Sequence, residues 1–251
     1  GAQILAYNSF DVKGANYIVL PAHDRMRIKA DIDLVAPDES GISVRSLGES
    51  TEPSDTLNLS IRNFSLEKIK NLSFVPDMDG MINLNANWIK TDGINDYTAF
   101  LRLNNFKFDK KDVGSIIVAG HTRPKETGTF AVAQLALDGS LVMDAQAFAP
   151  KREGAKARWS AKISELPLDK ANPFLPKDML ELKGYLNADI RNYDTTKDIQ
   201  TTNTGTIDGV MHFDSASIFI PKINESYGLD NKKIHVKEDV LRLDNFALAA
   251  N

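Results

Sequence analysis

The sequence predicts an almost all-β fold, an elongated antiparallel meander with one or two short helices. Apolar and charged residues alternate from Met26 to Leu34, which is typical of a strand with one buried and one solvated face. Thr206–Leu248 breaks into short apolar pieces separated by polar turns, as at Lys237–Asp239 and Asp244–Asn245. Asp138-Gly139 joins two apolar runs at hairpin distance. All three patterns favour strands that reverse direction repeatedly.

The N-terminal half contains one predicted strand after another, and we expect a typical length of about five or six residues. Residues 36–55 are rich in Pro, Asp, Glu, Ser, Gly and Thr, so they form either a strand with mobile flanks or an exposed loop. Ser65 can cap a short helix over Leu66–Leu72, and Asp77–Gly80 favours a turn. The predicted strands are Ile4–Ala6, Ala15–Leu20, Met26–Leu34, Leu57–Arg62, Met81–Trp88, Phe100–Leu103 and Phe106–Phe108.

The middle of the chain continues the meander through Ser115–Ala119 and Leu141–Ala145. Phe130–Leu137 is rich in alanine and could form one or two helical turns. Because Gly128 and Asp138-Gly139 flank it at hairpin distance, a strand is favoured. Asp194–Gly205 is polar and rich in threonine, so we expect a long or disordered loop there.

Two segments, at about 57–108 and 157–213, follow the same order of features. In each, a strand precedes a short helix, a proline turn, a glycine and another strand. Leu66 corresponds to Leu168 and Gly80 to Gly184, so a second helix is expected at Pro167–Ala171. We therefore expect a single β region over residues 1–251 that contains two diverged repeats.

Composition and charge exclude several classes of protein. With 251 residues and 42% hydrophobic content, the chain is globular rather than disordered. Its 30 basic and 34 acidic residues include no long basic run, so nucleic acid is not an expected partner. Without cysteine it can form neither a disulfide nor a thiolate metal site. No apolar run approaches the roughly 20 residues that span a membrane as a helix.

No pattern of catalytic or metal-binding residues stands out. Asp77–Gly80 resembles the start of a calcium loop, but Ala86 stands where that loop requires a bidentate Glu. The phosphate-binding and nucleophile-elbow glycine motifs are absent, and no two of the 34 acids are singled out as a glycosidase pair. The four histidines are scattered: His23, His121, His212 and His235. We therefore expect a non-enzymatic protein with no catalytic residue, no metal site and no cofactor.

The apolar strand faces need a cover, which a second sheet, helices or a ligand can provide. Either two sheets pack as a sandwich, or one curved sheet folds over on itself and leaves a lined groove. Trp88 and Trp159 are expected to pack within the fold rather than to stack on a ligand. In the groove, the candidate lining residues are Met26, Ile28, Ile32, Leu34, Leu57, Leu59, Ile61, Ile82, Leu84, Leu101, Leu103, Leu186, Ile190, Ile207, Met211, Phe213, Leu241, Leu243 and Phe246.

The C-terminal segment contains, in this order, Ile220-Pro221, Tyr227–Asn231, Lys237–Asp239 and Leu241–Phe246. This order resembles the repeating unit of AsmA-like, TamB-type (translocation and assembly module) proteins of the Gram-negative envelope, in particular the long ones of Bacteroidetes. It implies a taco-like β-trough with an apolar lining. It also implies a periplasmic location, acyl chains as ligands, and a role in lipid transfer between membranes or in outer-membrane protein assembly.

We also expect the chain to be a fragment of a longer, membrane-anchored protein, because it starts at Gly1-Ala2 and stops abruptly after Phe246–Leu248. Two other functions remain open on the sequence alone. A carbohydrate-binding or adhesive β-sandwich of the cell surface would show clustered aromatic residues on its solvent face. A glycan-processing β-protein would instead show a pair of acids in a cleft.

Overall fold

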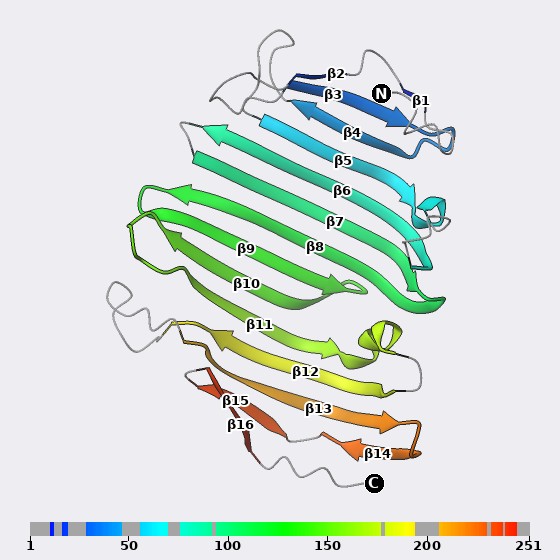
Figure 1. The fold of residues 1–251 in the computed structure, drawn as a ribbon, viewed down its shortest axis with the longest axis vertical. Helices are drawn as coiled ribbons and strands as arrows, with labels where there is room; N and C mark the ends of the chain where they lie inside the picture. Colours follow the sequence, from blue (N-terminus) through cyan, green and yellow to red (C-terminus); the bar gives the residue numbers. More distant parts are fainter. Residues whose placement is uncertain are drawn as a thin grey trace. The chain divides into compact units, whose positions relative to one another are not determined.

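The computed structural model describes residues 11–12, 17–19, 29–46, 56–69, 76–91, 94–176, 179–193, 206–229, 232–237 and 239–244. The chain divides into two compact units. Unit 1 comprises Gly1–Lys110 and Gly114–Pro124, and unit 2 comprises Lys111–Val113 and Lys125–Asn251. Figure 1 shows that strands dominate both units, so the prediction of an all-β fold is confirmed.

Unit 1 is an open antiparallel sheet in which most strands pair with their neighbours along the chain. The strand order is β1-β3-β4-β5-β6-β7-β8, and β2 also pairs with β3. Most of β8 belongs to unit 1. The strands are β1 (Asp11–Val12), β2 (Tyr17–Val19), β3 (Lys29–Val35), β4 (Gly41–Ser46), β5 (Thr56–Ser65), β6 (Met78–Thr91), β7 (Ile94–Phe108) and β8 (Lys111–Lys125).

Unit 2 repeats this architecture in the order β9-β10-β11-β12-β13-β15-β16, with β14 pairing the far half of β13. A two-residue turn, Asp138-Gly139, joins β9 to β10 with positive φ at both residues, as a tight hairpin requires. The strands are β9 (Gly128–Leu137), β10 (Ser140–Pro150), β11 (Arg158–Pro167), β12 (Glu181–Arg191), β13 (Asp208–Ile220), β14 (Glu225–Gly228), β15 (Lys233–Lys237) and β16 (Val240–Asp244). The alanine-rich segment is thus a strand, β9.

The central strands are longer than the expected five or six residues, so that expectation is wrong. Phe100–Leu103 and Phe106–Phe108 are parts of one strand, β7, which has 15 residues, and β6 has 14. Asp77–Gly80 is not a turn, because β6 already begins at Met78. Turn-forming residues can occur inside these strands because β-bulges accommodate their irregular backbone.

Two short 3₁₀ helices stand where the sequence places helices. They are η1 (Leu66–Ile69) and η2 (Leu168–Phe174), each following a strand directly. A lysine ties each one to a hairpin turn that lies earlier in the same unit. Lys68 Nζ lies 2.7 Å from Asp38 Oδ2, and Lys170 Nζ lies 2.8 Å from Asp138 Oδ2. The hydrogen bond from Lys68, together with those from Ser40, lowers the pKa of the Asp38 carboxyl to about 2.

The segments that the sequence pairs as a repeat share further local features. Both the β5–β6 and the β11–β12 ladders contain a bulge just before the 3₁₀ helix. The bulged residues Asn63 and Glu165 have φ values of 46° and 49°. Each donates its backbone N–H to an asparagine Oδ1 on the next strand, Asn83 at 2.9 Å and Asn187 at 2.8 Å. The same side-chain contact therefore holds the bulge in both segments.

A second bulge pair lies one strand later, at Gly80 in β6 and Gly184 in β12. Their φ values are +127° and +87°, a region that side chains disfavour. A Cβ on Gly80 would lie 2.9 Å from the carbonyl oxygen of Asn104, and one on Gly184 would overlap the backbone of Ser215 and Ala216. Both positions therefore require glycine for two reasons, the backbone angle and the close approach of the next strand.

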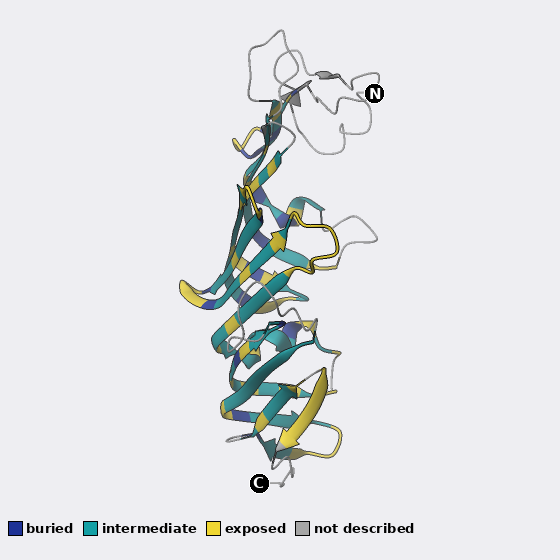
Figure 2. Cartoon of the chain, turned by 90° about the vertical axis from the view of Figure 1, so that its left-hand side faces the viewer, coloured by how far each residue is buried: buried dark blue, intermediate teal, exposed yellow. Residues whose placement is uncertain are grey.

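Most residues of both units are half-buried, which Figure 2 shows as the predominance of teal. Each described strand joins the single sheet of its unit, so no second sheet covers an apolar face within the described parts. Fully buried apolar side chains are few, and several lie near the 3₁₀ helices and bulges, among them Phe64, Leu66 and Phe106. The prediction of an open meander is confirmed, and a sealed two-sheet core is absent from the described strands.

A candidate apolar binding face

One face of the unit 1 sheet is apolar, and we call it the apolar face of unit 1. Residues that pair across neighbouring strands point to the same side of a sheet. One row of paired residues crosses five strands: Leu34, Ile42, Ile61, Leu84 and Leu101. A second row contains Ile32, Val44, Leu59, Ala86 and Ala99. The pairs Leu57–Trp88 and Ile82–Leu103 extend the face along the strands.

Unit 2 has an apolar face built in the same way. One row of paired residues crosses seven strands: Leu135, Met143, Ile163, Ala188, Met211, Ile234 and Leu243. Next to it lie Ile190, Gly209, Val236 and Leu241, and Leu186 pairs with Phe213. Ile207 precedes β13 at the position that continues this alternation.

Every candidate lining residue that lies within a described strand is therefore on the apolar face of its unit. Met26, Ile28 and Phe246 lie outside the described residues. Several further members of these faces are not among the predicted lining residues, although each belongs to an alternating run: Ile42, Val44, Trp88, Leu135, Met143, Ile163, Ile234 and Val236. Alternation was the signal that could have found them, because it marks the side on which each residue lies.

The apolar faces are accessible rather than sealed. Leu34 and Ala188 are buried, with 6% and 5% of their surface exposed. Leu241 and Leu243 lie in β16, the last described strand, and they are 64% and 57% exposed. Most other lining side chains are half-buried. An apolar molecule could therefore reach these side chains and remove further apolar surface from water.

The opposite side, which we call the polar face of each unit, is occupied by side chains that bind one another across strands. In unit 1, Asn58 Nδ2 donates to Asn87 Oδ1 at 2.8 Å, and Arg45 pairs with Asp33 at 2.8 Å. In unit 2, Asn187 Nδ2 donates to Asp214 Oδ2 at 2.6 Å. The two faces thus differ strongly in polarity, which gives each sheet a defined apolar side.

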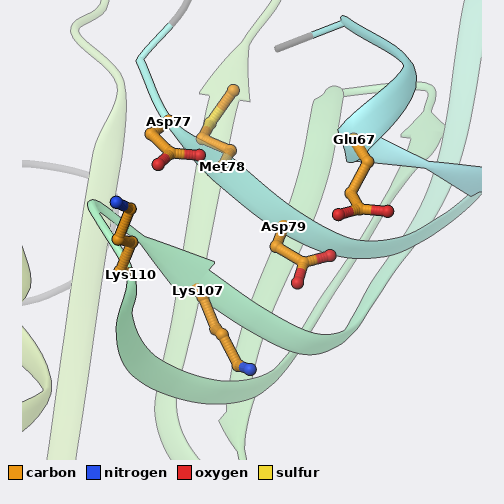
Figure 3. A pocket seen from close by; sticks show the side chains of 6 residues that line it. All are labelled: Glu67, Asp77, Met78, Asp79, Lys107 and Lys110. Atoms are coloured by element: carbon orange, nitrogen blue, oxygen red, sulfur yellow. The ribbon is translucent and has the colours of Figure 1, made fainter.

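A hollow of about 260 Å³ in unit 1 has a different character (Figure 3). Charged side chains of both signs line it, namely Glu67, Asp77, Asp79, Lys107 and Lys110, together with Met78. Asp79 also accepts a hydrogen bond from the backbone N–H of Gly80 at 2.6 Å. This lining suits neither an acyl chain nor a cation, so the hollow is not the candidate site.

No group of three or more histidine or acidic side chains suited to a metal ion occurs among the residues that the structure describes. His212 Nε2 lies 3.6 Å from Asp214 Oδ2 on the polar face of unit 2. His121 lies in β8 and His235 in β15, so described histidines are spread over separate strands. His23 is outside the described residues.

In the described parts of the chain, no helix has the length and apolar character needed to cross a bilayer. No family model, curated protein or solved structure matches the chain. The candidate site is therefore defined by its geometry alone, as the two apolar faces.

Proposed function

We propose that this chain is a non-enzymatic module of the cell envelope whose apolar faces hold lipid acyl chains. The observation that carries the proposal is the continuous row of apolar residues across seven paired strands of unit 2, from Leu135 to Leu243. A comparable row crosses five strands of unit 1. No sheet covers either row within the described strands.

The energetics of acyl binding fit a face without a polar motif. Burying one methylene contributes roughly 0.8 kcal/mol, so about ten methylenes contribute on the order of 8 kcal/mol before ordering costs. Headgroup contacts are therefore not needed for binding. A half-buried lining also avoids the large penalty of leaving a fully exposed apolar sheet in water.

The resemblance to AsmA-like, TamB-type proteins supports a cellular setting for this activity. We place the module in the periplasm, as part of a longer protein anchored in the inner membrane. There it would transfer phospholipid between the membranes or assist outer-membrane proteins during assembly. Both roles use the same property, an apolar face that shields a lipid or an apolar strand from water.

Paired substitutions on one strand test the proposal. Leu101 and Arg102 are neighbours in β7 that point to opposite faces, as do Leu243 and Arg242 in β16. Leu101→Asp and Leu243→Asp are expected to abolish uptake of a fluorescent fatty acyl probe while the protein stays soluble and melts cooperatively. Arg102→Asp and Arg242→Asp are the matched controls, and they should leave uptake unchanged.

The result that would overturn the proposal is equally specific. If the wild-type protein takes up no probe, and the two leucine variants aggregate, then the apolar faces serve only to build a protein core. Charges placed in a sealed core lack both water and partners, so the resulting destabilisation of several kcal/mol would explain the aggregation.

A further inference from the structure

Unit 2 contains a hollow of about 360 Å³ near the end of β10 and the start of β11, and most of its described lining residues point to the polar face. Its position follows from the register: Phe130 pairs with Phe148, and Phe148 pairs with Arg158, so these three side chains share one side of β9, β10 and β11. Four of the eight described lining residues are aromatic, and one of them, Trp159, alternates with Arg158 and therefore points to the apolar face. The lining consists of Phe130, Gln146, Ala147, Phe148, Arg158, Trp159, Ser160 and Tyr193.

The backbone around Phe148 leaves room for its ring. Gly128 pairs with Pro150, and a Cβ on Gly128 would lie 2.7 Å from Cζ of Phe148. A larger residue at position 128 would therefore displace the ring. The ring of Phe148 thus lies over the beginning of β9, beside its cross-strand neighbour Phe130.

Asn192 fixes the place of the fourth aromatic residue, Tyr193. The Asn192 side chain, only 8% exposed, accepts the backbone N–H of Trp159 at 2.7 Å and donates to the carbonyl of Ala157 at 2.9 Å. The backbone N–H of Asn192 donates to the Trp159 carbonyl at 3.1 Å. These three bonds attach the end of β12 to the start of β11, so Tyr193 is held at the edge of the hollow.

The polar side chains of the hollow, unlike their neighbours, have no partner among the described residues of the protein. Arg158, Gln146 and Ser160 form no side-chain hydrogen bond or ion pair within the described part of the chain. Near the hollow on the polar face, Gln134 of β9 donates from Nε2 to Oδ2 of Asp144 in β10 at 3.0 Å. No acidic residue is among the described residues that line the hollow. Arg158 is thus the one charged side chain of the described lining, and it has no carboxylate partner among the described residues.

We propose that this hollow binds an acidic sugar, a pyranose ring that carries a carboxylate. The C–H face of a sugar ring stacks on aromatic side chains such as Phe148 and Tyr193. The guanidinium of Arg158 can bind a carboxylate through two parallel hydrogen bonds. Gln146 and Ser160 offer donors and acceptors for hydroxyl groups. The volume is at the lower end of the range for small-molecule sites, which suits one sugar unit.

Sugar binding can be tested separately from acyl binding, because Phe148, Arg158 and Ser160 point to the side opposite the apolar face. The test compares D-glucuronate with D-glucose in ligand-observed NMR titrations of the whole chain at millimolar concentration. The wild-type protein is expected to bind glucuronate at least about tenfold more tightly than glucose, the effect of one charge-assisted contact. Arg158→Gln should remove this preference, and Phe148→Ala should weaken the binding of both sugars.

Lys162→Gln is the matched control, since Lys162 lies on the same strand and face as Arg158 but outside the hollow and also loses one positive charge. It should keep the preference for glucuronate. Equal binding of the two sugars by the wild-type protein would overturn the proposal, whether or not any variant folds. So would an equal loss of preference in Arg158→Gln and Lys162→Gln, because the preference would then arise from net charge alone.

Discussion

Gly184 offers a quantitative test of how the bulges hold unit 2 together. Gly184 and Gly139 have the same φ, +87°, but different surroundings. A Cβ on Gly139 would have no atom within 4 Å, whereas one on Gly184 would overlap the backbone of Ser215 and Ala216 in β13. Replacing each glycine with alanine therefore separates the effect of the backbone angle from the effect of the overlap.

The expected magnitudes follow from these surroundings. Gly139→Ala should lower the free energy of unfolding by about 1–2 kcal/mol, the penalty for a left-handed L-residue. Gly184→Ala adds to this a displacement of β13, and overpacking of this kind typically costs about 1–3 kcal/mol more. The predicted loss for Gly184→Ala is therefore about 2–5 kcal/mol.

Urea denaturation of the two variants and the wild type measures both values, with the slope of the transition as a check that the same surface unfolds. Equal losses in the two variants would refute the reasoning, because the two glycines share the same φ and only Gly184 is closely approached by β13. A smaller loss for Gly184→Ala than for Gly139→Ala would refute it more strongly.

Two further predictions concern single side chains. The pKa of Asp38 is lowered to about 2, so its ion pair with Lys68 should contribute fully above about pH 4, the range of an unfolded Asp, and be lost as the pH falls towards 2. The stability difference between wild type and Asp38→Asn should thus be constant from pH 7 to about 5 and fall steeply as the pH approaches 2, as urea melts at each pH would show; a difference as large at pH 2 as at pH 7 contradicts it. Asn192→Ala should cost about 2–4 kcal/mol, because it removes two side-chain bonds and leaves the backbone N–H of Trp159 and the carbonyl of Ala157 unpaired. Hydrogen exchange at Trp159 measures this loss, and unchanged protection there would contradict it.

Alternation was enough to place residues on the correct face. Leu84 and Leu101 are far from Ile61 and Leu34 in sequence, yet all four lie in one row because each strand alternates independently. The order of strand, short helix, proline turn and glycine that the two repeats share also predicted the positions of both 3₁₀ helices. These properties are local, so the sequence contains them directly.

The remaining features depend on pairing between strands. Asp77–Gly80 has turn-forming residues, but pairing with β7 extends β6 through them, and a bulge at Gly80 absorbs the irregularity. The hollow beside Phe148 brings in Tyr193, a distant residue that only the β10–β11–β12 order places nearby. Neither result could be obtained from residue types alone, because the register of a strand depends on the strand with which it pairs.

The lining itself can be mapped with a photo-crosslinkable fatty acid, followed by mass spectrometry of the modified peptides. We expect labels at apolar-face positions such as Leu84, Leu101, Met211 and Leu243. Their polar-face neighbours Asn85, Arg102, His212 and Arg242 should remain unlabelled. Labels distributed equally over the two faces, or no labels at all, would contradict the claim that the apolar faces hold acyl chains.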